Sequence, residues 1–317
     1  MGMNRIQFQP GLSLEQFLES FGTEERCEEA LEQVRWPEGF QCPKCGHGDH
    51  GIVHGRRHKR YQCKECRHQT TLTAGTIMES TKLFLRTWLL ALYFISHAKN
   101  GISALELMRH LGVSYRTAWL IHHKIMKAME HREGLYVLSG KVQIDDAYLG
   151  GELSGGKPGR GSENKVPIVA AVSLSENGHP LRCKFSTVEG FTSDAIAEWA
   201  KKSLASSCTV VSDGLACFRN VTSNGCSHEP IVTGGRHPDE LPEFKWVNTF
   251  LGNLKTSING TYHALDFEKY SKRYIGAFSY MVNRRFDLSS LVIRLLVAVS
   301  NCPPHPERQL RLAELRH

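Results

Sequence analysis

The sequence lacks the long apolar segments on which membrane insertion and secretion depend. Its 317 residues contain no run of 18 apolar residues, so we expect no transmembrane helix. The N-terminal stretch MGMNRIQFQPGLSLEQF has no apolar segment of the kind found in secretion signals. The sequence therefore predicts a cytoplasmic protein without a membrane partner.

Acidic residues are scarce in the middle third of the chain. Residues 41–140 hold fifteen Lys and Arg against six Asp and Glu, a balance of +9 within a net charge of +7. Residues 1–40 are acidic instead, with three basic and eight acidic residues, and residues 141–317 carry +3. This distribution indicates a polyanionic partner for the middle third. Charge alone is weak evidence, because many basic proteins bind no polyanion.

The ten cysteines include two closely spaced pairs in FQCPKCGHGDHGIVHGRRHKRYQCKECRHQTTL, with seventeen residues between the pairs. Each CxxC turn places two thiolates on one side, and two such turns complete a tetrahedral Zn²⁺ site. We therefore predict a structural zinc ribbon held by Cys42, Cys45, Cys63 and Cys66. The alternative is two unrelated thiol pairs. The other six cysteines are scattered without a pattern and are expected to be small apolar fillers.

Basic residues gather between the two cysteine pairs. Arg56, Arg57, Lys59 and Arg60 lie there, and Lys64 and Arg67 follow. A ribbon this basic is suited to phosphate contacts, so we predict that the first four bind DNA. The alternative is a charged, solvated hairpin.

Helical patterns dominate residues 12–36 and 83–130. The first segment predicts two short helices, the second of them capped by Thr23. In the second segment, Gly112-Val113-Ser114 joins two amphipathic stretches and indicates a helix-turn-helix. The second helix of this motif would then contact the DNA bases. Its candidate DNA contacts are Tyr115, Arg116, Lys124 and Lys127. A plain helical hairpin that packs on the next domain remains the alternative.

Residues 141–245 change to an α/β pattern. KVQIDDAYLGG is typical of a strand, a hairpin turns at Glu176-Asn177-Gly178, a helix begins at Ser193, and CTVVSDG is a short buried strand. This order predicts a mixed sheet with helices, as in the RNase H-like fold. Between the first strand and the hairpin lies a Gly- and Ser-rich basic loop, LSGGKPGRGSENK.

Two of these strands end in aspartate. Asp145 and Asp213 would repel each other at neighbouring strand ends unless a divalent cation lay between them, and hard oxygen ligands indicate Mg²⁺ or Mn²⁺. Asp146 is a lesser candidate, because adjacent strand residues face opposite ways and only one of the two is expected to enter the site. The alternative is that both aspartates merely begin turns.

The stretch WVNTFLGNLKTSINGTYH adds an amide and an ammonium group. Asn248 and Lys255 are seven residues apart, which is about two turns of a helix, so both side chains would point the same way. A solvated helix surface explains this alignment equally well.

Seven short segments, in order, resemble one family. They are RWPEGFQCPKCG, YQCKECRHQTTLTAGTIMESTKL, KNGISALELMRHLGVSYRTAWLIHHKI, VQIDDAYLGG, VVSDG, WVNTFLGNLKTSINGTYH and SYMVNRRF. Together they resemble the zinc-ribbon transposases of bacterial insertion sequences, whose RNase H-like domain of the DDE type cuts and joins DNA ends. The resemblance covers most of the chain from about residue 12 to residue 286.

The resemblance implies a role for each matching residue. Asp145 and Asp213 match the first two catalytic carboxylates of the family. Asn248 falls at the third catalytic position, where glutamate is commonest, and resembles a branch of the family that has asparagine at this position. An amide oxygen can still bind Mg²⁺, although without charge. Lys255 would then contact a DNA phosphate near the cut.

The resemblance also implies partners and a domain order. The partners would be double-stranded DNA, as element ends and target, and further copies of the chain in a dimer or larger oligomer, at the nucleoid of a bacterial cytoplasm. The expected order is an N-terminal helical segment, a zinc ribbon, a helix-turn-helix region, the catalytic domain and a tail, over residues 1–39, 40–80, 81–135, 136–300 and 301–317. Two alternatives remain: a DNA-binding regulator that has lost catalysis, and a nuclease of the same fold without end specificity.

Overall fold

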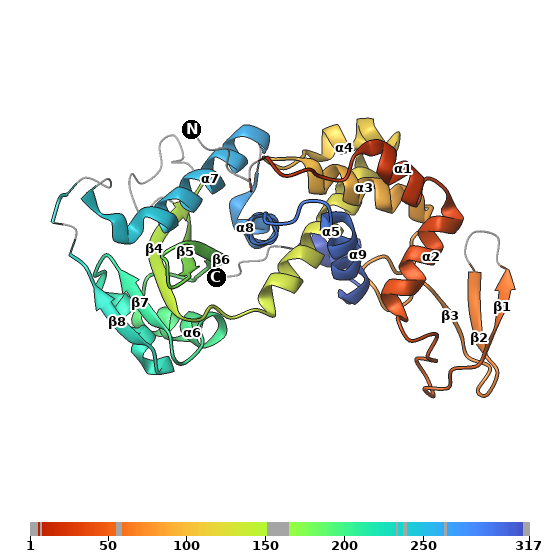
Figure 1. Ribbon diagram of the computed structural model, residues 1–317, viewed down its shortest axis with the longest axis horizontal. Coiled ribbons are helices and arrows are strands. Elements are labelled where there is room, and N and C mark those ends of the chain that lie inside the picture. The colour runs from red at the N-terminus through yellow and green to blue at the C-terminus, as the bar shows by residue number, and fades with distance from the viewer. Residues whose placement is uncertain are drawn as a thin grey trace. The chain divides into compact units, whose positions relative to one another are not determined.

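The computed structural model describes residues 6, 8–54, 59–150, 165–232, 234–236, 240–262 and 265–312 (Figure 1). The chain divides into two compact units, and each is described here by itself. Unit 1 comprises Met1–Met129 and Arg284–Leu310, and unit 2 comprises Glu130–Asn283 and Arg311–His317. No helix among the described residues is both long and apolar enough to cross a bilayer.

Unit 1 is built on helices. Their bounds are α1 (Leu14–Phe21), α2 (Glu24–Arg35), α3 (Leu85–His97), α4 (Ala104–Leu111), α5 (Tyr115–Gly134, which continues into unit 2), α9 (Leu291–Asn301) and α10 (Glu307–Leu310). Helix α9 packs against α2 and α3, so a segment near the C-terminus completes a core that the N-terminal helices begin.

Local sequence explains where several of these helices begin and end. Thr23 accepts a hydrogen bond from Arg26 N at the start of α2, and Ser103 accepts one from Glu106 N at the start of α4. Gly112 ends α4 with φ 63°, in the left-handed region that favours glycine. Ser114 Oγ then accepts from Thr117 N in the first turn of α5. The predicted helix, turn and helix are confirmed as elements.

A small three-stranded sheet holds the cysteine region of unit 1. Its strands β1 (His50–His54), β2 (Lys59–Cys63) and β3 (Gln69–Thr71) pair antiparallel in the order β1-β2-β3. The sheet is attached to α2: the Tyr61 hydroxyl donates to Glu32, Lys59 pairs with Glu28, and the Arg35 guanidinium donates to Thr71 O. The acidic start of the chain therefore supplies anchors for the basic ribbon.

Unit 2 contains a mixed five-stranded sheet. Its strands are β4 (Lys141–Leu149), β5 (Val166–Leu174), β6 (Pro180–Thr187), β7 (Thr209–Ser212) and β8 (Ser227–Pro230), and its helical elements are α6 (Ser193–Ser203), η2 (Ala216–Asn224), η4 (Pro242–Phe244), α7 (Lys245–Thr261) and α8 (Phe267–Asn283). The order is β6-β5-β4-β7-β8, antiparallel from β6 to β4 and parallel from β4 to β8.

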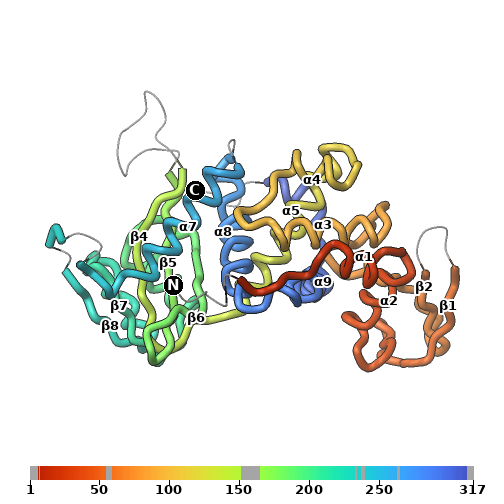
Figure 2. Tube along the Cα trace, turned by 45° about the horizontal axis from the view of Figure 1, so that its top comes forward, coloured from red at the N-terminus to blue at the C-terminus, as the bar shows by residue number. Residues whose placement is uncertain are grey.

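Alternation along β4 divides the core of unit 2 into two layers. Val142 and Ile144 pack in a cluster with α6 and η2, whereas Ala147 and Leu149 pack in a cluster with α7. The helices therefore cover both faces of the sheet. Figure 2 labels α7 and α8 beside strands β4 to β6. The predicted mixed sheet and the hairpin turn at Gly178, with φ 72°, are confirmed. All but the last residue of the predicted loop LSGGKPGRGSENK lies outside the described residues.

Candidate functional site

The four paired cysteines come together in unit 1. Their sulfur atoms lie 3.6 Å apart between Cys42 and Cys66, 3.6 Å between Cys45 and Cys63, and 3.4 Å between Cys45 and Cys66. These distances exclude disulfides, for which sulfur atoms lie about 2 Å apart. They fit a tetrahedral Zn²⁺ site, whose Zn–S bonds of about 2.3 Å place sulfurs roughly 3.7 Å apart.

The two CxxC turns have the same backbone design. Cys42 N donates to His47 O and Gly46 N to Cys42 O, and in the second turn Cys63 N donates to His68 O and Arg67 N to Cys63 O. Gly46 and Arg67 occupy equivalent positions, and both have positive φ, 76° and 59°. Glycine adopts this conformation at no steric cost, whereas arginine is unusual there.

The local donors make the cluster a good cation site. Burial raises the pKa of Cys42, but backbone N–H groups of Lys44 and Cys45, together with neighbouring thiols, outweigh it and lower the pKa to about 6. A thiolate is the form that binds zinc. The four-cysteine donor set therefore fits a structural zinc ion.

A second cluster lies in unit 2, in the middle of β4 and at the end of β7. The prediction that the first of these strands ends in aspartate is wrong, because β4 stays paired with β5 as far as Leu149. Asp145, Asp146 and Asp213 each have a carboxylate oxygen within 4.8 Å of the others, and all three side chains are half-buried. Asp213 directly follows β7, and its Oδ1 accepts from Leu215 N at 3.0 Å. Gly214, with φ 85°, makes the turn that allows this contact.

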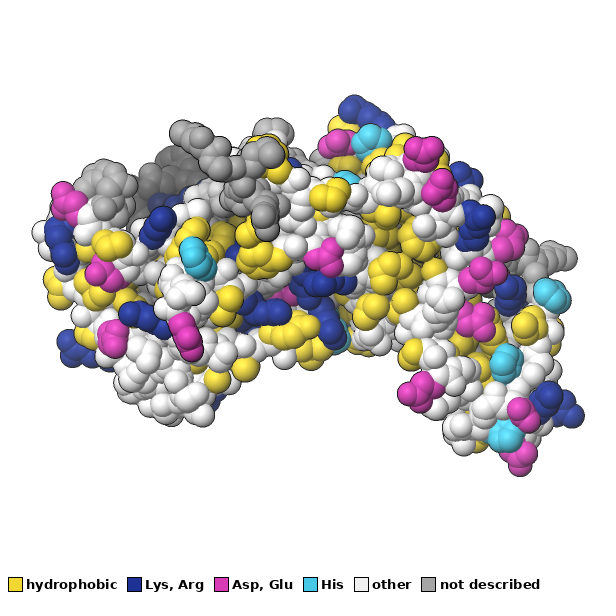
Figure 3. All heavy atoms as spheres, in the orientation of Figure 1, with side chains coloured by type: hydrophobic (Ala, Val, Ile, Leu, Met, Phe, Trp, Pro, Cys, Tyr) yellow, Lys and Arg dark blue, Asp and Glu magenta, His cyan; other side chains and the backbone are white. Residues whose placement is uncertain are grey.

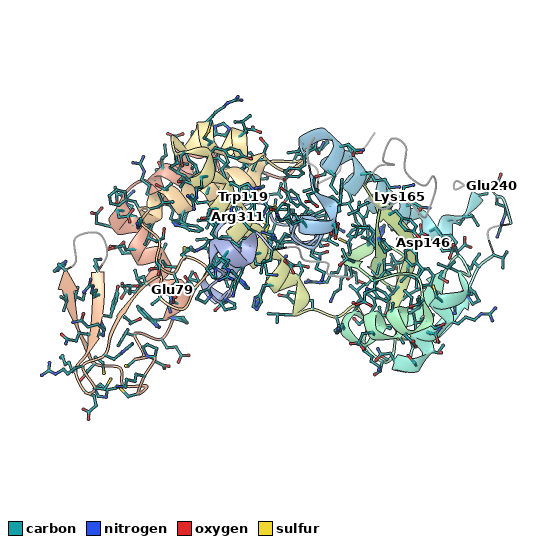
Figure 4. The ribbon with its side chains drawn as sticks, turned by 180° about the vertical axis from the view of Figure 1, so that it is seen from behind. Glu79, Trp119, Asp146, Lys165, Glu240 and Arg311 are labelled. Carbon is teal, nitrogen blue, oxygen red and sulfur yellow. The ribbon has the colours of Figure 1, made fainter. Side chains whose placement is uncertain are left out.

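Asp146 belongs to this cluster, contrary to the expectation that only one of the adjacent aspartates would enter the site. Their side chains do leave β4 on opposite faces, but β7 stops pairing with β4 at the register Gln143–Val211. Beyond that point none of the described strands pairs with this edge of β4, so both carboxylates can approach Asp213. Asp146 is labelled beside the sheet in Figure 4.

The environment of this cluster disfavours ionisation of Asp145. Burial raises the pKa of Asp145 to about 7, with further contributions from the charges of Asp146 and Asp213, against the backbone N–H of Asp146 and the charge of Lys255. Oxygen donors on one octahedral Mg²⁺ lie roughly 3–4 Å apart, so small movements would bring these carboxylates onto one ion. The donor set fits Mg²⁺ or Mn²⁺.

Helix α7 carries the other two predicted site residues. Asn248 lies in its first turn and Lys255 two turns later, and both are exposed beside a buried stripe of Val247, Leu251 and Leu254. The positive charge of Lys255 acts to lower the pKa of Asp145, although burial and the neighbouring carboxylates outweigh it. The start of α7 is tied to β4, because Gln143 Oε1 accepts from Trp246 N at 3.2 Å and Val247 N at 3.1 Å.

Two family models match these two units. The ISXO2-like transposase domain matches residues 137–283, which include the acidic cluster, and the transposase zinc-ribbon domain matches residues 22–69, which include the four cysteines. The chain belongs to the insertion-sequence transposases. The resemblance to this family that the sequence indicated is confirmed. The predicted fold class, an RNase H-like α/β domain preceded by a zinc ribbon, is confirmed as well. One relative is a protein of Halobacterium salinarum that is described as an uncharacterized protein in transposable element ISH50. It is 28% identical to this chain, over 63% of this chain and 71% of its own length.

The predicted DNA contacts of the zinc ribbon differ in their surroundings. Arg56 and Arg57 lie outside the described residues. Lys59 Nζ is 2.9 Å from the buried Glu28, an ion pair within the fold of the transposase, whereas Arg60 is exposed. On the face shown in Figure 3, basic side chains of the ribbon end are interspersed with acidic and histidine side chains.

The residues of α5 that were predicted to contact DNA differ in their exposure to solvent. The Arg116 side chain is 77% exposed and pairs with Glu307 through its Nε and Nη2 atoms at 3.2 and 3.0 Å. Lys124 is only 9% exposed, and its Nζ donates to Ile77 O at 2.7 Å. Lys127 is half-buried. The first turn of α5 is therefore the part that offers side chains to solvent, while its middle belongs to the core.

Proposed function

We propose that this transposase binds the ends of its element and cuts and joins DNA at the acidic cluster of unit 2. The observation that carries the proposal is the convergence of Asp145, Asp146 and Asp213 within 4.8 Å, inside the segment that matches a transposase domain. Three clustered carboxylates reduce the stability of a fold unless they hold a cation, so their presence favours a catalytic role.

Each residue has a distinct part in the proposed chemistry. A divalent cation, when bound, supplies Lewis-acid stabilisation of the phosphodiester and a more reactive water or hydroxyl. Asp145 and Asp213 would hold and orient that ion, and Asn248 would add a neutral amide oxygen. Lys255, whose positive charge partly offsets the raised pKa of Asp145, would bind a DNA phosphate as a point charge. No high-energy cofactor is needed, since strand transfer exchanges one phosphodiester for another.

The DNA-binding part of the proposal rests on unit 1. We propose that the zinc ribbon and the turn between α4 and α5 bind the terminal inverted repeats, with Arg60 and Arg116 as exposed contacts. Arg56 and Arg57 remain proposed contacts from the sequence. Because two element ends must be held together for joining, we also propose a dimer or larger oligomer on DNA.

The test uses the full chain and a labelled duplex that carries the element ends. We expect Asp145→Asn and Asp213→Asn to abolish Mn²⁺-dependent cleavage and strand transfer while end binding survives. Asp194→Asn, an exposed aspartate on α6, is the matched control and should cut normally. Normal cutting and joining by either cluster variant would overturn the assignment of these carboxylates.

A regulator without catalysis is the second candidate, and Asn248 favours it. An amide in place of a third carboxylate binds a cation less tightly because it carries no charge. The same duplex separates the possibilities. Absence of nicking by the wild-type protein, together with a footprint confined to the inverted repeats, would support the regulator. Nicking without a confined footprint would support a general nuclease.

A further inference from the structure

A buried amide beside the acidic cluster has no part in the chemistry described so far. Gln143 lies on β4 two residues before Asp145, so both side chains leave the strand on the same face. Gln143 is only 3% exposed. A buried amide without hydrogen bonds costs roughly 1–3 kcal/mol, so its partners indicate why it is tolerated there.

The partners are two backbone donors in the first turn of α7. Trp246 N and Val247 N both donate to Gln143 Oε1, at 3.2 and 3.1 Å. These belong to the group of N–H donors that a helix leaves unpaired at its start. The local N-cap residue, Phe244, offers no side-chain hydrogen bond, so the strand supplies the cap that the helix itself lacks.

The position of this cap connects it with the proposed site. Asn248 is the next residue after Val247, and Lys255 follows seven residues later on the same side of α7. The Trp246 indole also donates to Gly178 O in the β5–β6 turn, which fixes the same end of the helix to the sheet. The start of α7 is thus held two residues from Asp145 along β4.

We propose that Gln143 is a positioning residue, whose side-chain oxygen fixes the start of α7 so that Asn248 and Lys255 face the carboxylate cluster. This inference rests on the proposed function, which it deepens. Because both donors to Gln143 Oε1 belong to the first turn of α7, Gln143 acts through that helix. A cap that served stability alone would leave cation binding and cleavage unaffected when removed.

Two substitutions separate positioning from simple packing. Gln143→Met keeps the length and volume but has no acceptor, whereas Gln143→Glu keeps an acceptor for the two N–H groups. Ser173→Ala on β5 is the matched control, because Ser173 is also buried and its hydroxyl donates to Arg182 O within the same sheet. It removes one buried hydrogen bond away from α7.

Two readouts are compared in the full-length protein. In the metal-free state, we expect Gln143→Met to speed hydrogen exchange at the Trp246 and Val247 amides by at least about tenfold. With Mn²⁺ and the labelled duplex, we expect a rate about 10–100-fold lower and a higher Mn²⁺ requirement, with DNA affinity unchanged. Gln143→Glu should restore slow exchange and most of the cleavage, and Ser173→Ala should match the wild type in both.

Three results would overturn the proposal. They are normal amide exchange in Gln143→Met, full cleavage despite fast exchange, and a loss in Gln143→Glu as large as in Gln143→Met. If the wild-type protein cuts no DNA, the proposed function fails, but this inference is still tested by Mn²⁺ binding measured through water proton relaxation. Weaker binding by Gln143→Met, with normal binding by Ser173→Ala, would support positioning, and equal binding would refute it.

Discussion

At Asp145 the proposed function and the stability of the fold oppose each other. Its pKa is raised to about 7, first by burial and then by Asp146 and Asp213, whereas an unfolded aspartate titrates near 3.8. Ionisation therefore penalises the folded state. The penalty is absent below about pH 4, grows as the pH rises, and is complete above about pH 7.

Removing this charge should stabilise the metal-free transposase. We expect Asp145→Asn to raise the free energy of unfolding by roughly 1–3 kcal/mol at pH 8, with a gain that shrinks steadily as the pH falls toward 4. Thermal unfolding with and without Mn²⁺ measures the effect. Asp194→Asn is the control and should show no comparable gain. A gain of the same size at every pH would contradict this electrostatic account.

At the residue scale, the sequence predicted which residues form the two clusters better than it predicted the contacts that individual side chains make. The cysteine spacing and the two aspartates identified clusters that the structure does bring together, although Asp145 lies in the middle of β4 and not at its end. Asp146 was underestimated, because strand alternation gives the direction of a side chain but not the point at which the neighbouring strand ends. A polar Gln143 between the apolar Val142 and Ile144 was the sequence signal of its contact with α7.

At the element scale, α5 combines two roles in one helix. Its first turn carries the exposed Arg116, while Lys124 is directed into unit 1 and donates to Ile77 O. Burial lowers the pKa of Lys124, which is the effect expected for an ammonium removed from water. Any DNA contact made by α5 should therefore come from its N-terminal turn.

Two substitutions on α5 test this division. We expect Arg116→Met to weaken binding to end DNA by about tenfold and to lower the salt dependence by about one counterion. Lys124→Met should leave both within about twofold, since its ammonium makes an internal contact. Fluorescence anisotropy over a range of salt concentrations measures both quantities. An equal loss in the two variants would contradict the assignment of α5 to two roles.

Helix starts show why elements were only partly predictable. The start of α2 was predicted correctly from Thr23, because the capping residue is local, and Ser103 caps α4 in the same local way. The start of α3 is capped instead by Glu24 of α2, which accepts hydrogen bonds from Leu85 N and Arg86 N. The start of α7 is capped by Gln143 of β4. In both cases the local N-cap residue is a phenylalanine without a capping bond, so no local pattern could indicate the true partner.

At the scale of the whole molecule, long-range packing was beyond the sequence argument. Helix α9 follows the segment that matches the transposase domain but packs with α2 and α3 in unit 1. An apolar helix near the C-terminus fits either unit equally well by composition, and only packing decides between them. Leu310 on α10 is likewise buried, in a region expected to be a loose tail.

The division into two units predicts that zinc and the catalytic cation act separately. The ribbon has a small sheet of its own, attached to α2 through Glu28 and Glu32, so metal binding should supply much of its folding free energy. Unit 2 has its own sheet and two apolar layers, and none of its described side chains belongs to the cysteine cluster.

Removal of zinc should therefore melt one unit locally and leave the other intact. We expect a zinc-selective chelator, or Cys63→Ser, to release about one zinc ion per chain and to expose residues 40–72 to protease. End binding should then be lost, while β4 and β5 keep their amide protection and the acidic cluster still binds Mn²⁺. Cys183→Ser is the control, since this buried cysteine lies on β6 in unit 2 and should not change the zinc content. Simultaneous loss of protection in both units would show that their folding is coupled through the ribbon.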